Sequence, residues 1–282
     1  MIRASTRLFG LLGHPVSHSL SPAMHNAALR ATGVDAVYLA FDVAPRELEG
    51  ALAGARALGA GGLNLTVPHK ERGLALAAEA DPLAEAAGAA NTLVPAPGGW
   101  KAYNTDVSGF VTALAEDLGF RARGRRCLVL GAGGAARAAV AGLLAEGAQE
   151  IFVANRNEQR ARRLVADLSE LGRRRLSPVA LERALGRLAA GDLLVSATPV
   201  GLRPDGAWPW DLRAADPAVV VYDMAYRPEG QTCLVRQARA AGLRASSGRS
   251  MLLHQGALAF ALWTGRPAPL SAMAAALGDP DR

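Results

Sequence analysis

Cysteine is scarce in this chain of 282 residues, and the two that are present, Cys127 and Cys233, lie far apart in the sequence. Two distant cysteines supply neither a disulfide framework nor a pair of metal ligands. The five histidines show no metal-ligand spacing either. We therefore expect a cytoplasmic protein, kept in a reducing compartment, with no bound metal.

Long apolar runs are missing as well. The longest candidate, residues 250–265, contains His254 and Gln255 and is shorter than the roughly 20 apolar residues that a membrane-spanning helix needs. The apolar run at residues 8–13 is too short for the core of a signal peptide, which takes about 7–15 residues. The sequence thus predicts neither a membrane span nor a signal peptide.

Lysine is nearly absent, although the formal net charge of the chain is +6. Only Lys70 and Lys101, among 31 Lys and Arg residues, are lysines. The arginines are spread over predicted helices, and no basic run alternates with aromatic residues as a nucleic-acid groove requires. The positive charge therefore favours small anionic substrates and nucleotide phosphates as partners, and not nucleic acid.

An alternation of strand and helix patterns runs through the chain. The first half predicts helices at 21–33, 45–59 and 69–80 and strands at 7–13, 36–43, 61–67, 91–95 and 100–104. The second half predicts a strand, a glycine turn and a helix in succession over 125–147. It also predicts helices at 107–120, 249–265 and 269–278, an arginine-rich helix after 156, and strands at 150–156, 192–199, 219–226 and 243–247. This order predicts an α/β fold with mostly parallel sheets and helical crossovers.

A glycine-rich turn lies in the second half. Residues 129–137, VLGAGGAAR, fit the G-x-G-x-x-G/A pattern with Gly131, Gly133 and Ala136. The pattern follows an apolar strand and opens a helix, which is the context that gives it physical meaning. Gly131 permits the tight turn, and Gly133 lets backbone amides approach a pyrophosphate. An ordinary strand-to-helix turn is the alternative.

The end of the next strand indicates which dinucleotide binds. An NAD site places a carboxylate about 20 residues beyond the glycine pattern, on the ribose 2′-hydroxyl. Here Asn155 and Arg156 occupy the strand end, and Arg160 follows. Guanidinium groups can meet a 2′-phosphate with forked donors, so the pattern favours NADP(H). We expect Arg162 and Arg163 on a solvated helix face.

Lys70 follows a predicted strand end, where parallel sheets meet their ligands. Arginine stays charged at any usable pH, whereas a lysine ammonium can shift its pKa and carry a proton. In a chain that otherwise uses arginine, Lys70 is a candidate for proton transfer. Asp106 is its candidate anionic neighbour, but it could instead cap the helix at 107–120. Lys101 is expected on the surface near a turn.

The first predicted loop contains two serines, Ser19 and Ser21, whose hydroxyls can hold a carboxylate. Ser21 precedes Pro22 and is equally a candidate N-cap of the helix at 21–33. The residues alone leave both roles open for Ser21.

Nine stretches of the chain appear in an order typical of one enzyme family. They are GHPVSHSLSPAMHN, NLTVPHK, AANT, YNTD, GAGGAAR, ANR, SATPVG, YDMAY and GRSMLLHQGALAF. Because they extend over nearly the whole chain, the sequence resembles the shikimate dehydrogenase family. The resemblance implies NADPH-dependent, reversible reduction of 3-dehydroshikimate to shikimate, in the biosynthesis of chorismate and aromatic amino acids.

The resemblance also implies two domains. A substrate domain at residues 1–106, completed by C-terminal helices at 247–282, would accompany a Rossmann NADP-binding domain at 107–246. The chemistry would take place in a cleft between them. The implied partners are the substrate and NADP(H) alone, and the chain would act as a monomer or homodimer.

Individual roles follow from the matched motifs. Lys70 and Asp106 match the catalytic pair of the family. The substrate-holding positions are matched by Ser19, Ser21, Asn64, Thr66, Asn91, Tyr226 and Gln255. The cofactor positions are matched by Gly131, Ala132, Gly133, Gly134, Ala135 and Ala136 for the pyrophosphate, by Asn155, Arg156 and Arg160 for the adenosine end, and by Thr198, Met224, Gly248 and Met251 for the nicotinamide side.

The chain departs from the family pattern at two positions. Asn157 stands where threonine is common, and Ser196 replaces the asparagine of NATP, so one phosphate contact and one side-chain hydrogen bond stay open. Two other hypotheses compete with an NADP-dependent dehydrogenase that acts on shikimate. One is an enzyme of the same family that uses quinate or an aminated shikimate, and the other is a non-catalytic NADP sensor. Ser19 argues against quinate, and the presence of Lys70 and Asp106 argues against a sensor.

Overall fold

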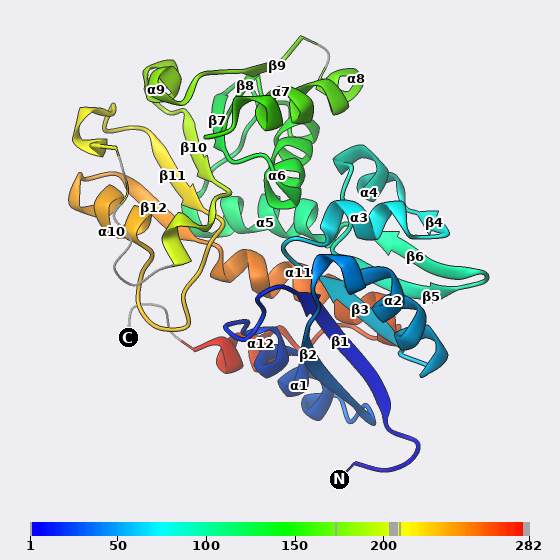
Figure 1. The fold of residues 1–282 in the computed structure, drawn as a ribbon. Coiled ribbons are helices and arrows are strands. Elements are labelled where there is room, and N and C mark those ends of the chain that lie inside the picture. The colour runs from blue at the N-terminus through cyan, green and yellow to red at the C-terminus, as the bar shows by residue number, and fades with distance from the viewer. Residues whose placement is uncertain (1, 173, 203–207, 209, 279–282) are drawn as a thin grey trace. The chain divides into compact units, whose positions relative to one another are not determined.

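The structure, a computed structural model, describes residues 2–172, 174–202, 208 and 210–278 (Figure 1). The described residues form two compact units. The first unit contains those up to Thr105 together with those from Leu252 to Gly278, and the second contains those from Asp106 to Met251. Residues 279–282 of the predicted C-terminal segment lie outside the described residues.

The first unit is built on a six-stranded sheet with the strand order β2-β1-β3-β5-β6-β4 (Figure 1). β1 pairs in parallel with β2 and β3, whereas β5 pairs antiparallel with β3 and β6. The carboxyl ends of β1, β2 and β3 therefore meet at one edge of the sheet, where ligands of parallel sheets bind. The strands are β1 (Arg7–Gly13), β2 (Ala36–Asp42), β3 (Gly62–Leu65), β4 (Glu79–Ala80), β5 (Thr92–Ala96) and β6 (Gly99–Tyr103).

The helices of the first unit match the predictions except in one region. The prediction of a helix at 69–80 is wrong in its second half, because α3 ends at Ala75 and Glu79–Ala80 form β4. Our prediction also omits α4, although Asp81 caps it by accepting from the backbone N–H of Ala84 at 2.9 Å. The helices are α1 (Ser21–Ala31), η1 (Pro45–Glu47), α2 (Leu48–Ala57), α3 (Lys70–Ala75), α4 (Pro82–Ala87), α12 (Leu270–Leu277) and, from Leu252 onward, α11 (Arg249–Thr264).

The second unit contains a wholly parallel six-stranded sheet with the order β12-β11-β10-β7-β8-β9 (Figure 1). This is the 3-2-1-4-5-6 order of the dinucleotide-binding fold, with β7 as its first strand, and it confirms the predicted α/β class. The strands are β7 (Arg126–Leu130), β8 (Glu150–Ala154), β9 (Leu176–Pro178), β10 (Leu193–Ser196), β11 (Val220–Asp223) and β12 (Arg244–Ser247). The helices are α6 (Gly134–Ala145), α7 (Glu158–Asp167), α8 (Ser169–Gly172), α9 (Leu181–Ala184), η2 (Leu185–Arg187), η3 (Pro199–Leu202), η4 (Leu212–Ala214), α10 (Cys233–Ala240) and, from Asp106 onward, α5 (Thr105–Leu118).

The abundant alanines allow close packing around α6. Nine residues of this helix are buried, and five of them are alanine or glycine. A Cβ added to Gly142 would lie 2.9 Å from a methyl carbon of Val111 in α5, so the two helices approach at a distance that only a glycine permits. Apolar as α6 is, no helix among the described residues has the length and hydropathy to cross a membrane.

Candidate active site

Lys70 is the first residue of α3 and follows β3 after a short loop. Its backbone carbonyl accepts from the N–H of Ala90 at 2.9 Å, which fixes the start of α3 against the chain before β5. The neighbouring His69 is buried, and its Nε2 lies 2.8 Å from the backbone oxygen of Val43. The imidazole of His69 is therefore engaged with the loop after β2, and burial lowers its pKa.

Asp106 is the second residue of α5 and is only 4% exposed. It lies inside the first turn of the helix, so it does not occupy the N-cap position that the sequence left open. The residue before it, Thr105, donates its backbone N–H to Oδ1 of Asn91 at 2.8 Å. The start of α5 is thus tied directly to a predicted substrate residue.

A buried network of amides and hydroxyls connects three of the predicted substrate residues of the first unit. Asn91 donates through Nδ2 to Oγ1 of Thr105 at 2.9 Å and to Oε1 of Gln255 at 3.1 Å. Asn64 donates to the hydroxyl of Thr92 at 3.0 Å, and that hydroxyl lies 3.2 Å from Oγ1 of Thr105. All five side chains are less than 9% exposed. The structure therefore brings Asn64, Asn91 and Gln255 together, although 164 residues separate the last two.

The loop residues after β1 and β3 have different surroundings. The alternative that Ser21 caps α1 is wrong, because Ser21 is the first helical residue and Leu20 precedes it without a side-chain cap. Instead, the hydroxyl of Ser19 accepts from the backbone N–H of Ser21 at 3.2 Å. Thr66, partly buried, follows β3 and donates its N–H to the carbonyl of Leu12 at 2.9 Å. The last predicted substrate residue, Tyr226, lies after β11 in the second unit.

The glycine turn has two glycines with different requirements. Gly131 has a φ of +113°, and an added Cβ would lie 2.8 Å from the backbone oxygen of Ala197. The fold itself therefore demands glycine at position 131. Gly133 caps α6 in an ordinary extended conformation, with a φ of −104°, and an added Cβ would meet nothing within 4 Å. The protein alone leaves the space beside Gly133 open.

This open space fits the pyrophosphate of a dinucleotide. A Cβ at position 133 would fill the place that a ligand needs in order to contact the backbone N–H groups at the start of α6. α6 begins immediately after Gly133, so these N–H groups and the positive end of the helix dipole point toward the turn. The other predicted residues of the cradle, Ala132, Gly134, Ala135 and Ala136, continue the turn into the helix without a bulky side chain.

The residues after β8 lie on the surface of the second unit. Arg156 and Arg160 are exposed, and Asn155 donates through Nδ2 to the backbone oxygen of Asn157 at 2.8 Å. Asn157 caps α7 by accepting from the N–H of Arg160 at 3.3 Å, which explains why an amide can replace a threonine here. No carboxylate stands between the end of β8 and Asn157.

The residues predicted for the nicotinamide side lie after β10, β11 and β12 of the second unit. The backbone of Gly248 closely approaches that of Met224, because a Cβ added to Gly248 would collide with the carbonyl oxygen of Met224. The hydroxyl of Ser196, which replaces the family asparagine, is buried and lies 3.1 Å from Oγ1 of Thr198. Met251 is 6% exposed and packs in the core.

A buried carboxyl group that the sequence analysis did not single out lies next to these residues. Asp223 is the last residue of β11, is 0% exposed and accepts from the N–H of Ala225 at 3.2 Å. Burial raises the pKa of Asp223 to about 6, although hydrogen bonds from Thr232, Ala225 and Ser196 oppose the rise. The signal in the sequence was an aspartate directly after the apolar run VVVY.

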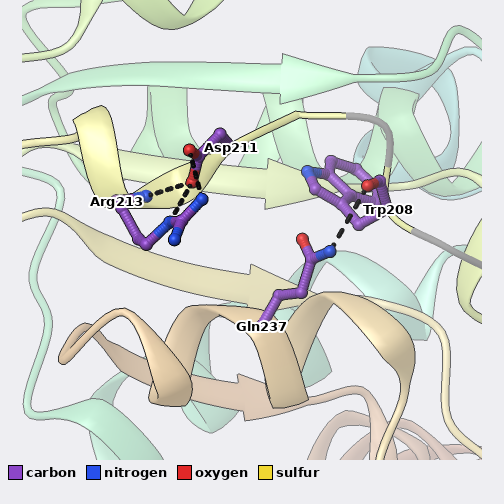
Figure 2. Close-up of polar contacts among 4 residues, drawn as sticks. All are labelled: Trp208, Asp211, Arg213 and Gln237. Carbon is purple, nitrogen blue, oxygen red and sulfur yellow. Dashed lines mark hydrogen bonds and ion pairs between the residues drawn. The ribbon is translucent and has the colours of Figure 1, made fainter.

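A hollow of about 520 Å³ lies elsewhere on the second unit, beside η4 and α10. Figure 2 shows its polar contacts: Gln237 donates to the backbone oxygen of Trp208 at 3.5 Å, and Arg213 forms an ion pair with Asp211 at 2.9 Å. None of the predicted site residues lines this hollow. Within the part of the chain that the structure describes, no group of three His, Cys, Asp or Glu residues is placed to hold a metal ion.

Three family patterns match the chain. Residues 11–93 match the shikimate dehydrogenase substrate binding domain, residues 113–201 match the shikimate / quinate 5-dehydrogenase family, and residues 248–277 match the shikimate 5′-dehydrogenase C-terminal domain. A protein of Methanopyrus kandleri named shikimate dehydrogenase (NADP(+)) is 47% identical over 96% of this chain and 95% of its own length. The chain belongs to the shikimate dehydrogenase family.

Solved structures of family members show the same fold with different ligands. The shikimate 5-dehydrogenase of Thermus thermophilus, in complex with NADP(H) and shikimate, is 40% identical, with a TM-score of 0.83 over 96% of this chain and 98% of that one. The quinate dehydrogenase of Corynebacterium glutamicum, in complex with NAD, is 33% identical, with a TM-score of 0.86 over 96% and 98% of the two chains. Membership of the family alone therefore does not choose between the two substrates or the two cofactors.

Proposed function

We propose that this protein is an NADP-dependent shikimate dehydrogenase, which reversibly reduces 3-dehydroshikimate to shikimate in the biosynthesis of chorismate and the aromatic amino acids. The observation that carries the proposal is the 47% identity, over nearly the full length of both chains, to a shikimate dehydrogenase (NADP(+)). The relative with NADP(H) and shikimate bound supports the same substrate and cofactor. Residues 1–106 with 247–282 would be the substrate domain and 107–246 the cofactor domain.

In this proposal Lys70 and Asp106 are the catalytic pair. Reduction of a ketone develops negative charge on its oxygen, and Lys70 donates a proton to that oxygen; in the reverse direction Lys70 accepts the proton. The carboxylate of Asp106 accepts a hydrogen bond from the hydroxyl and holds it for transfer. NADPH, when bound, supplies the hydride.

The remaining residues bind and orient. Ser19, Ser21 and Tyr226 hold the carboxylate of shikimate through their hydroxyls, because an anion is best held by several donors. The amides of Asn91 and Gln255 face the ring hydroxyls, and the other proposed substrate contacts are Asn64 and Thr66. The cofactor is held by Gly131, Ala132, Gly133, Gly134, Ala135 and Ala136, by Asn155, Arg156 and Arg160, and by Thr198, Met224, Gly248 and Met251.

A panel of initial rates tests this function. Purified protein is assayed with shikimate, quinate and an aminated shikimate, each with NADP⁺ and with NAD⁺. We expect kcat/KM to be highest for shikimate with NADP⁺. A preference for quinate with NAD⁺ would instead place the chain with the Corynebacterium glutamicum type of relative, and NADP⁺ binding without turnover of any substrate would favour the sensor.

The first expected outcome concerns Gly133. Gly133→Ala should leave the melting temperature of the free protein unchanged or slightly higher, because the backbone is already extended and the added Cβ meets no atom. The same methyl group blocks the approach of the pyrophosphate, so the Kd for NADP⁺, measured by calorimetric titration, should rise about tenfold or more. Gly54→Ala, on α2 and equally free of contacts, is the matched control. Unchanged NADP⁺ affinity in Gly133→Ala would contradict the proposal that the pyrophosphate binds beside Gly133.

The second expected outcome concerns the 2′-phosphate. Arg156→Ala or Arg160→Ala removes a charge-assisted hydrogen bond worth roughly 1.5–3 kcal/mol, so the KM for NADP⁺ should rise about tenfold or more while the KM for NAD⁺ changes little. Arg162→Ala is the matched control, because Arg162 pairs with Glu158 at 3.3 Å on the exposed side of α7. If the variants raised both KM values equally, the arginines would not recognise the phosphate.

We also propose that the protein works in the cytoplasm, consistent with its two buried, unpaired cysteines. For its state of association we propose a monomer or homodimer, which light scattering on the purified protein distinguishes from larger assemblies. Its only proposed ligands are small molecules, and retention on DNA that weakens with salt would contradict this.

A further inference from the structure

A tyrosine that is absent from the predicted site closes one end of the buried amide network. Tyr38 in β2 is 1% exposed, and its hydroxyl donates to Oδ1 of Asn64 in β3 at 2.7 Å. In the sheet Tyr38 is the partner of Phe9, and Asn64 is the partner of Leu11, so the phenol reaches across β1 to a residue two strands away. The contact thus joins two strands that are not hydrogen-bonded to each other.

The amide of Asn64 has little hydrogen-bonding capacity left. Its Nδ2 donates to the backbone oxygen of Asn91 at 3.0 Å and to Oγ1 of Thr92 at 3.0 Å. A side-chain amide has two N–H donors, and both are used inside the protein. Its oxygen accepts from Tyr38 and has a second lone pair. Asn64 can therefore meet a ligand only as an acceptor, through Oδ1.

Tyr38 is itself held firmly on two sides. Its backbone N–H donates to Oδ1 of Asn26 at 3.0 Å, and Nδ2 of Asn26 donates back to the carbonyl of Tyr38 at 2.8 Å. Its ring stacks on that of His25, with 4.4 Å between centroids and 13° between planes. The ring of His25 in turn packs against that of Trp263 in α11, with 5.3 Å between the ring centroids. The phenol oxygen is consequently fixed in position and cannot swing away from Asn64 without disturbing the core.

We propose that Tyr38 is a positioning residue for substrate, acting through Asn64. By donating to Oδ1, it sets the tilt of the amide and satisfies one lone pair, so that Asn64 offers a single, directed acceptor to a substrate hydroxyl. At Oδ1 of Asn64, the site therefore binds a substrate whose ring carries a hydroxyl, which can donate, more tightly than one whose ring carries only an acceptor at that position. This inference rests on the proposed function, in which a polyhydroxylated ring acid is the substrate.

Tyr38→Phe makes the decisive change, because it keeps the ring and its stacking on His25 and removes only the donor. We expect the KM for shikimate to rise about five- to thirtyfold, the loss of one buried hydrogen bond, while kcat falls much less and the KM for NADP⁺ is unchanged. Asn64→Ala should raise the KM at least as much, and the double variant should match Asn64→Ala alone, because Tyr38 acts only through the amide. Tyr103→Phe, on β6 of the same sheet, is the control and should behave as wild type.

Several results would overturn the inference. A normal KM in Tyr38→Phe, or effects of Tyr38→Phe and Asn64→Ala that simply multiply, would show that Tyr38 does not act through Asn64. Tyr38→Phe could be uninformative because it does not fold, which a failure to bind NADP⁺ would reveal. In that case a normal KM for shikimate in Asn64→Ala would overturn the inference by itself. A raised KM for shikimate in Thr92→Val would support the claim that hydrogen bonds within the protein orient the amide of Asn64. Inactivity of the wild type with shikimate and NADP⁺ would instead refute the proposed function.

Discussion

Replacing Lys70 by arginine or by alanine is expected to lower kcat for shikimate oxidation by about 10²–10⁴-fold, the usual cost of losing general acid–base help. The KM for shikimate should change much less. Arginine keeps the positive charge, but a guanidinium releases its proton only above a pH of about 12, and it presents a planar fork where a compact ammonium should fit. Both variants should therefore fail at the chemical step, and for the same reason.

The other lysine of the chain provides the matched control. Lys101 lies in β6, forms an ion pair with Glu79 of β4 at 3.7 Å, and places its Nζ 5.7 Å from the centroid of the Tyr103 ring. Lys101→Arg should keep normal kcat and KM, because either cation can make these contacts. If Lys70→Arg kept near-normal kcat, charge alone would matter at position 70; if only the KM rose, Lys70 would be an anchor for substrate.

Acid is expected to destabilise the first unit through His25. This histidine is 1% exposed, and neither ring nitrogen has a hydrogen-bond partner among the described residues. Burial lowers the pKa of His25 to about 3, whereas the unfolded chain has its usual value of 6.5. Between these two pH values the unfolded state binds more protons than the folded state, so stability is lost as the pH falls from 6.5 toward 3. The full loss is roughly 5 kcal/mol, at about 1.4 kcal/mol per pKa unit.

Amide hydrogen exchange of β1 and β2, followed between pH 7 and pH 4, measures this effect within the first unit. His25→Phe keeps a flat ring against Tyr38 and cannot take up the proton. The free energy of unfolding derived from its amide exchange should therefore depend much less on pH than that of the wild type. Asp223 in the second unit has the opposite effect. Its pKa is raised to about 6, so its contribution to the free energy of unfolding becomes more favourable as the pH falls below 6. Equal slopes in wild type and His25→Phe would show that another group causes the acid sensitivity.

The sequence predicted those parts of the fold that depend on local signals. The glycine turn of β7 and α6 combines an apolar strand, a glycine with positive φ and an alanine-rich helix, all within one short stretch. The break between α3 and α4 was missed, because the stretch at 76–80 continues a good helix pattern, and only the pairing of β4 with β6 converts its end to a strand. At the end of this stretch, pairing with residues distant in the sequence outweighs the local helix propensity.

The site shows the same division. Lys70, Asp106 and the cofactor turn were predicted from residue type and from motifs. Tyr38 was not, because its proposed role depends on a contact with a residue 26 positions away in the sequence. A tyrosine in an apolar strand is an ordinary core residue until the structure shows what its hydroxyl meets. Likewise Thr92 and Thr105 have meaning only once β5 and α5 place them beside Asn91.

The central claim is most directly tested by measuring kcat/KM for the oxidation of shikimate by NADP⁺ with the purified protein, beside Lys70→Ala prepared in the same way. The account predicts a value in the ordinary range for enzymes, about 10⁴–10⁸ M⁻¹s⁻¹, with one NADPH formed per 3-dehydroshikimate and a loss of about 10²–10⁴-fold in the variant. Formation of NADPH by the wild type no faster than by Lys70→Ala would contradict it.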